Sequence, residues 1–64
     1  MTDVDRKAAE AADAETRGDF RTAARLYQQL GTALQGEHGR FDPRAVDAFE
    51  RSARAVRKSA EASP

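Results

Sequence analysis

The sequence predicts an all-α protein, an antiparallel up-down-up three-helix bundle. Apolar residues recur at spacings of three and four in three separate segments, which is the period of a helix face. Glycine-bearing breaks separate the segments, and no stretch shows the alternating β-branched pattern of a strand. Because the two connections are short and the helices are of similar length, we expect neighbouring helices to run antiparallel.

The first helix is expected over residues 2–17. Thr2 and Asp5 have the spacing of a variant capping box at its start. Its apolar stripe consists almost wholly of alanine and comprises Val4, Ala8, Ala11 and Glu15, with Ala12 beside it. An alanine face can approach a neighbouring helix closely, but it buries little apolar area for each residue.

The second helix is expected over residues 19–35, with Asp19 as its N-cap. It carries the strongest apolar stripe of the chain, formed by Ala23, Tyr27, Leu30 and Leu34. Gly31 lies within this helix, where glycine costs about 1 kcal/mol relative to alanine. We interpret Gly31 as a glycine at a crowded helix crossing; the alternative is a slot left open for a partner.

The third helix is expected over residues 43–60, after a loop that begins at Gly36. Asp42 and Pro43 are typical of an N-cap and a first helical position, and Phe41 is placed to pack on Val46. Its stripe has a regular three–four spacing and comprises Val46, Phe49, Ala53, Val56 and Ala60. The stripes of the three helices are expected to meet at one centre and to bury Tyr27, Leu30, Leu34, Phe49, Ala53 and Val56.

Ten apolar side chains larger than alanine, apart from Met1, can form only one small core. We therefore expect a single small helical domain over residues 1–64, in which residues 61–64 begin a linker or tail. We interpret the chain as the N-terminal domain of a larger protein. Arginine outnumbers lysine nine to two and alanine is abundant, which is consistent with a high-GC bacterial source.

The hairpin segment Gly18-Asp19-Phe20-x-x-Ala23-x-x-x-Tyr27 resembles the centre of a tetratricopeptide repeat (TPR). The whole chain is more similar to microtubule-interacting-and-trafficking (MIT) domains, which are three-helix bundles with such a hairpin. Their third helix carries an aromatic-x-x-x-Ala-x-x-apolar-basic run, and the run Phe49 to Arg57 matches it. The arginine usual before that alanine is Ser52 here. The resemblance implies an adaptor-like role in protein–protein interaction.

Composition excludes several classes of function. There is no cysteine, so there is no disulfide and no thiolate metal site, and His38 is the single histidine. Nucleotide-binding glycine loops and calcium loops are missing as well. We expect no enzyme activity, no cofactor and no metal. No apolar stretch is long enough for a membrane span or a signal peptide, so we expect a cytoplasmic protein without a membrane partner.

Charge is balanced overall, with eleven basic and eleven acidic residues, but it is unevenly distributed. Residues 1–20 hold six acids and three bases, a net −3, and residues 43–60 hold five bases and two acids, a net +3. Arg51, Arg54 and Lys58 form a basic stripe that either attracts the acidic first helix or guides an acidic partner. A stripe of three bases neutralises few phosphates and has no interleaved aromatic residue, which disfavours nucleic acid.

The function that the sequence favours is a non-catalytic interaction module that binds an amphipathic, acidic helix or peptide in an inter-helix groove. The expected groove is bordered by the third helix, with candidate residues Arg51, Ala53, Arg54, Val56, Arg57 and Lys58. The alternative is a self-associating helical homodimerisation domain. A small nucleic-acid-binding or regulatory factor is a third and weaker hypothesis.

Overall fold

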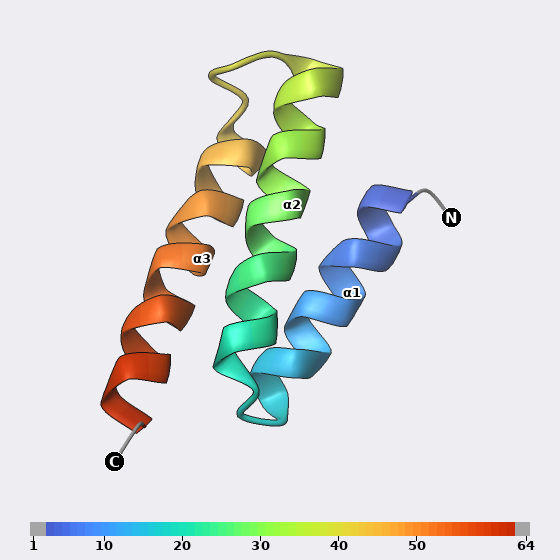
Figure 1. The fold of residues 1–64 in the computed structure, drawn as a ribbon. Coiled ribbons are helices and arrows are strands. Elements are labelled where there is room, and N and C mark those ends of the chain that lie inside the picture. The colour runs from blue at the N-terminus through green and yellow to red at the C-terminus, as the bar shows by residue number, and fades with distance from the viewer. Residues whose placement is uncertain (1–2, 63–64) are drawn as a thin grey trace.

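The computed structural model describes residues 3–62 and contains three helices: α1 (Asp3–Thr16), α2 (Phe20–His38) and α3 (Pro43–Ala62). Within these residues there is no strand, and successive helices run in opposite directions (Figure 1). The predicted all-α, three-helix class is confirmed. Thr2, the predicted capping residue, lies outside the described residues, and so does the end of the predicted tail, residues 63–64.

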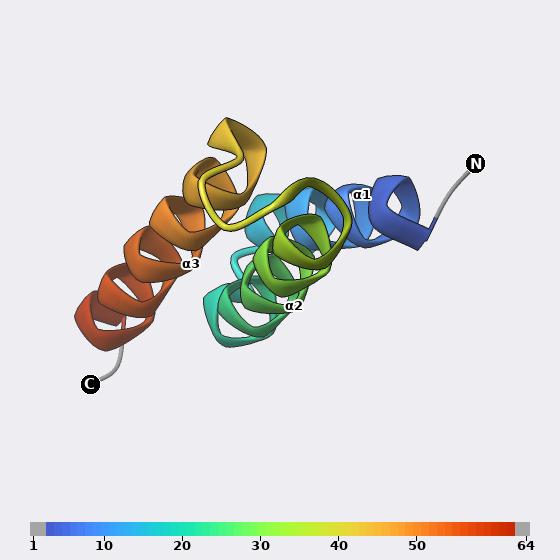
Figure 2. The ribbon, with the colours of Figure 1, turned by 90° about the horizontal axis from the view of Figure 1, so that it is seen from above.

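The helix α2 lies between the other two. It packs against both α1 and α3, which make few direct contacts with each other. Figures 1 and 2 show α1 and α3 on different flanks of α2, and the molecule measures 39 × 23 × 12 Å. The expectation that three stripes meet at one centre is therefore wrong. The core consists instead of two helix–helix interfaces that share α2.

The break between α1 and α2 has the predicted residues. Gly18 has a φ of 80°, a backbone conformation that glycine adopts without a steric penalty. The side chain of Asp19 accepts a hydrogen bond from the backbone N–H of Thr22 at 3.3 Å, which confirms Asp19 as the N-cap of α2. The pKa of Asp19 lies below its usual value because hydrogen bonding from the Thr22 side chain, and then from the Thr22 backbone N–H, favours the carboxylate.

The second break is shorter than predicted. α2 continues through Gly36 to His38 and ends at Gly39, whose φ is 99° and whose N–H donates to the carbonyl of Gln35. Asp42 accepts a hydrogen bond from the backbone N–H of Arg44 at 2.7 Å, so it caps α3 as predicted. Phe41 is 85% exposed, and the predicted packing of Phe41 on Val46 is therefore wrong.

The face that α3 buries is not the one predicted. Its buried residues are Ala45, Ala48, Ser52 and Ala55. Phe49 is only partly buried, Ala53 is exposed, and Val46 and Val56 are 44% and 56% exposed. Small residues let the α3 backbone approach α2, and the Ser52 hydroxyl donates to the carbonyl oxygen of Ala24 at 2.9 Å. The prediction of buried Ala53 and Val56 is thus wrong, because the close α2–α3 contact accommodates the small side chains.

Alanine accounts for most of the remaining core. Tyr27, Leu30 and Leu34 of α2 are buried as predicted. The other buried apolar residues outside α3 are Ala11, Ala14, Ala23 and Ala24. With so few large side chains, α2 is the one helix that brings a continuous row of bulky apolar residues to both neighbours.

Candidate functional site

A groove of about 530 Å³ lies over α2, between α1 and α3. Its floor is formed by Tyr27, Leu30 and Leu34, the row of large residues on α2. Figure 1 shows α1 leaning away from α2 toward its N-terminal end, so the space between α1 and α3 widens there. The walls consist of residues from α1 and α3, namely Val4, Asp5, Ala8, Ala12, Pro43, Arg44, Asp47, Ala48 and Arg51.

The walls are open because their apolar side chains are small. Ala8 and Ala12 on α1 face Ala48 on α3, and methyl groups cannot reach across the row of α2 side chains between them. Leu30 and Leu34 are nevertheless 7% and 4% exposed, so most of their surface is already packed. The groove is therefore a shallow apolar channel on a firm floor, a shape suited to side chains supplied by another molecule.

Tyr27 joins all three helices at the floor of the groove. Its hydroxyl donates to Glu15 Oε1 on α1 at 3.3 Å, and the Arg51 guanidinium of α3 lies 5.9 Å from the ring centroid. Burial raises the pKa of the Tyr27 hydroxyl, so this group stays protonated and remains a hydrogen-bond donor at neutral pH. The tyrosine thereby fixes the separation of the two walls at this point.

Of the charged groups that line the groove, Asp5 lies on α1, and Arg44, Asp47 and Arg51 lie on α3. Arg51 Nε donates to Asp47 Oδ2 at 2.9 Å, and this contact is the main cause of the raised pKa of Arg51. Arg44 donates to both carboxylate oxygens of Asp42, at 3.3 Å and 3.2 Å. That pairing is the main reason that the pKa of Asp42 is lowered. Each rim arginine is thus held in place by an aspartate.

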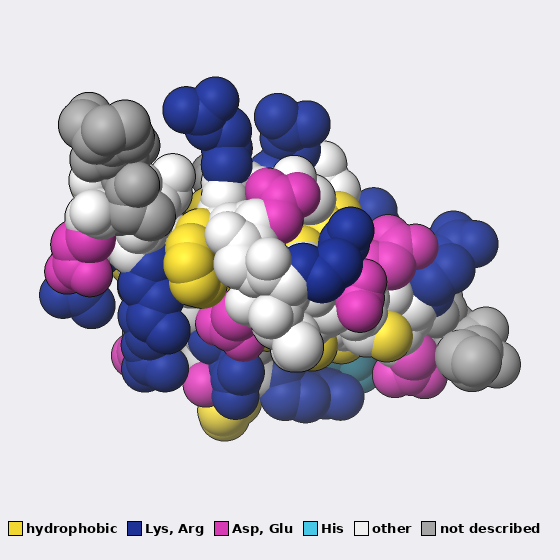
Figure 3. All heavy atoms as spheres, turned by 90° about the horizontal axis from the view of Figure 1, so that it is seen from below, with side chains coloured by type: hydrophobic (Ala, Val, Ile, Leu, Met, Phe, Trp, Pro, Cys, Tyr) yellow, Lys and Arg dark blue, Asp and Glu magenta, His cyan; other side chains and the backbone are white. Residues whose placement is uncertain are grey.

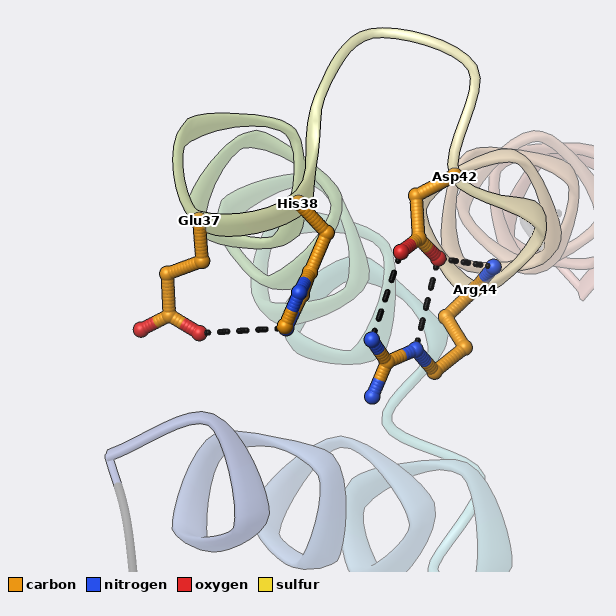
Figure 4. Close-up of polar contacts among 4 residues, drawn as sticks. All are labelled: Glu37, His38, Asp42 and Arg44. Carbon is orange, nitrogen blue, oxygen red and sulfur yellow. Dashed lines mark hydrogen bonds and ion pairs between the residues drawn. The ribbon is translucent and has the colours of Figure 1, made fainter.

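Figure 4 shows the upper end of the molecule, near the mouth of the groove. The Arg44 guanidinium extends from α3 into the space above α1, beside the capping carboxylate of Asp42. Glu37 and His38 form a second pair at the end of α2, with 3.6 Å between His38 Nε2 and Glu37 Oε2. Glu37, His38 and Arg44 are exposed here, whereas the Asp42 side chain is 11% exposed. This end of the molecule therefore offers polar contacts beside an apolar channel.

The structure does not bring the predicted site residues together. Arg51 lines the groove, but Val56 lines a different hollow of about 420 Å³ between α2 and α3. The ammonium group of Lys58 lies 5.5 Å from the centroid of the Phe20 ring. Ala53, Arg54 and Arg57 are exposed and line neither space.

Sequence reasoning missed the α1 wall and the α2 floor because those residues were assigned to a closed core. One signal pointed to them. The stripe of α1 has Val4 as its single large apolar residue, too little to fill the space beside the row from Tyr27 to Leu34.

The surface charges do not form one uniform basic patch. Seen from below, basic and acidic side chains are interspersed over the whole face (Figure 3). No group of three or more His, Cys, Asp or Glu residues within the described part of the chain is arranged to hold a metal ion. None of the helices described is long and apolar enough to cross a membrane.

No protein-family model, no curated protein and no solved structure matches this chain significantly. The groove and the surfaces of the three helices are therefore the features that bear on its function.

Proposed function

We propose that this chain is a non-catalytic protein-interaction module and that its α1–α3 groove binds an amphipathic helix of a partner protein. The observation that carries the proposal is an apolar channel with large residues on its floor and alanines on its walls. Ala8, Ala12 and Ala48 leave room for the bulky apolar side chains of such a helix. The side chains of that helix would fill the space that α1 and α3 leave open above α2.

The charges of the two walls support an orientation for that helix. α1 holds five acids and two bases, a net −3, and α3 holds five bases and three acids, a net +2. A partner helix with an acidic flank beside Arg44 and Arg51, and a basic flank beside α1, complements both walls. Charges at a groove rim act mainly on association rate and specificity, while the apolar floor supplies affinity.

The resemblance to MIT and TPR proteins is part of this proposal and favours the same class of role. Ser52, which stands where MIT domains carry an arginine, is buried against α2 and donates to Ala24. That position is not available to a partner in this chain. The candidate site is therefore the α1–α3 groove, with Arg51 as the one residue that it shares with the site predicted on the third helix.

The decisive experiment selects helical peptides from a phage-displayed library against the whole chain. Ala12 is exposed and lines the groove, so Ala12→Trp fills the channel. Ala9 is exposed on the same helix but outside the groove, and Ala9→Trp is the matched control. We expect selected peptides to bind Ala12→Trp at least about tenfold more weakly than the parent and to bind Ala9→Trp as the parent.

A second pair of variants tests the rim. Arg51→Gln removes a charge from the groove wall, and Arg54→Gln removes one that lines neither the groove nor the hollow beside Val56. We expect the first to flatten the salt dependence of peptide association and the second to leave it unchanged. Peptides that bind Ala12→Trp as tightly as the parent, or a library that yields no binder, would refute the groove as the site.

A further inference from the structure

The apolar stripe of α3 lies beside the α2–α3 interface and is largely exposed, apart from Phe49, whose ring packs against Gly31 of α2. Val46 and Val56 are 44% and 56% exposed, Ala53 and Ala60 are exposed, and Phe49 lies partly buried at the edge of α2. The spacing three–four–three–four is that of the a and d positions of a coiled coil. Isolated exposed apolar residues are common, but a regular stripe along a twenty-residue helix is typical of an interface.

The charged residues that flank this stripe indicate what covers it. Glu50 and Arg57 directly follow Phe49 and Val56, so both occupy e positions on the same edge of the stripe. Both are exposed, and neither forms an ion pair or hydrogen bond within residues 3–62. One acid and one base, seven residues apart on one edge, form a self-complementary pattern.

The orientation follows from that pattern. When two such helices pack antiparallel, each e position faces an e position of the other helix, so Glu50 meets Arg57 and Arg57 meets Glu50. In a parallel pair, e positions face g positions, which here are Ser52 and Ser59. Ser52 is buried and donates to α2, so it is not available for such a contact. Only in the antiparallel arrangement does each Glu50 and each Arg57 of the dimer meet an opposite charge.

We infer that the chain forms a two-fold symmetric homodimer in which the outer stripes of two α3 helices pack antiparallel. Ala53 of each copy packs on Val56 of the other. Glu50 of each copy pairs with Arg57 of the other, so the two pairs lie on opposite sides of the two-fold axis.

The dimer surface and the groove are separate. Arg44, Asp47 and Arg51 line the groove, and none of them belongs to the outer stripe. The homodimer therefore leaves both grooves open and presents two copies of the binding site. It does not depend on the function proposed above, since its interface contains no residue of the groove.

Sedimentation equilibrium of the whole chain, from about 10 μM to about 1 mM, tests the inference. The parent is expected to reach the dimer mass within this range, and Val56→Asp to remain monomeric throughout it. Ala9→Asp adds the same charge to an exposed alanine of α1 and is expected to dimerise as the parent. Circular dichroism of each variant verifies helix content, which an exposed substitution leaves unchanged.

Charge reversal tests the pairing itself. Glu50→Arg and Arg57→Glu each create two like-charge contacts by symmetry, and each is expected to weaken dimerisation about tenfold. The double variant E50R/R57E restores opposite charges and is expected to return to within about threefold of the parent. A parent that stays monomeric, a dimer unaffected by Val56→Asp, or a double variant no tighter than the single ones would each overturn the inference.

Discussion

The ring of Phe49 on α3 lies directly against Gly31 on α2. A Cβ atom at position 31 would come within 2.8 Å of Phe49 Cε1 and Cζ, which is closer than real Cβ contacts. Gly31 is buried in the middle of α2, so the glycine marks the point where the ring enters the α2–α3 interface. This confirms the interpretation of a crowded crossing, and the space is filled by Phe49 of the chain itself.

Gly31→Ala is expected to destabilise the protein although alanine is the better helix former. The overpacking penalty of about 1–3 kcal/mol exceeds the gain of about 1 kcal/mol in helix propensity. Gly36→Ala is the matched control, because position 36 is also helical and has nothing within 4 Å of an added Cβ. Urea unfolding should show the control gaining about 0.5–1 kcal/mol. Equal stabilisation of both variants would contradict the contact.

Phe49→Ala is expected to lower the free energy of unfolding by about 2–3 kcal/mol, below the 3–5 kcal/mol typical of a fully buried ring. The reduction reflects the partial exposure of Phe49. Val56 lies on the exposed side of the same helix. Val56→Ala should therefore change the free energy of unfolding by less than about 0.5 kcal/mol. Thermal melting at low protein concentration measures both, and equal losses in the two variants would place Val56 in the core.

Ser52→Ala removes the buried hydrogen bond between α3 and the carbonyl of Ala24. The expected loss is about 0.5–1.5 kcal/mol, the usual net contribution of such a bond. The control is Thr32→Ala, because the Thr32 hydroxyl is exposed and bonds only to Gln28 of its own helix. That variant should stay within about 0.5 kcal/mol of the parent in chemical unfolding. A larger loss for Thr32 than for Ser52 would refute the role of the inter-helix bond.

Tyr27 is the single tyrosine of the chain, so ultraviolet absorbance reports its ionisation alone. Burial raises the pKa of its hydroxyl above the ordinary value of 10.0 in the folded protein. Above that ordinary value the unfolded chain loses the proton first, so stability should fall as the pH rises past it. Tyr27→Phe cannot lose a proton, and its stability should lack this part of the alkaline decrease. A folded-state midpoint at or below the value in urea would contradict the burial.

The local sequence is sufficient to predict the helices and most of their ends. Asp19, Asp42 and Pro43 act within a few residues of themselves, through side-chain caps and a constrained φ. The buried row of Tyr27, Leu30 and Leu34 was also predictable, because no other helix offers comparable apolar area. The end of α2 was misjudged, since Gly36 is compatible with a helix and the positive φ of Gly39 is what ends it.

The face that α3 buries was decided by the tertiary structure. α3 has two neighbouring apolar faces, one of Ala45, Ala48, Ser52 and Ala55 and one with the larger Val46, Phe49 and Val56. Apolar area favours burying the larger face, and the sequence prediction followed it. The close contact with α2 selects the smaller face instead and leaves Val46 and Val56 exposed, while the Phe49 ring packs against Gly31. The groove has a related cause, because the alanine side chains of α1 pack near α2 but are too short to fill the space between α1 and α3.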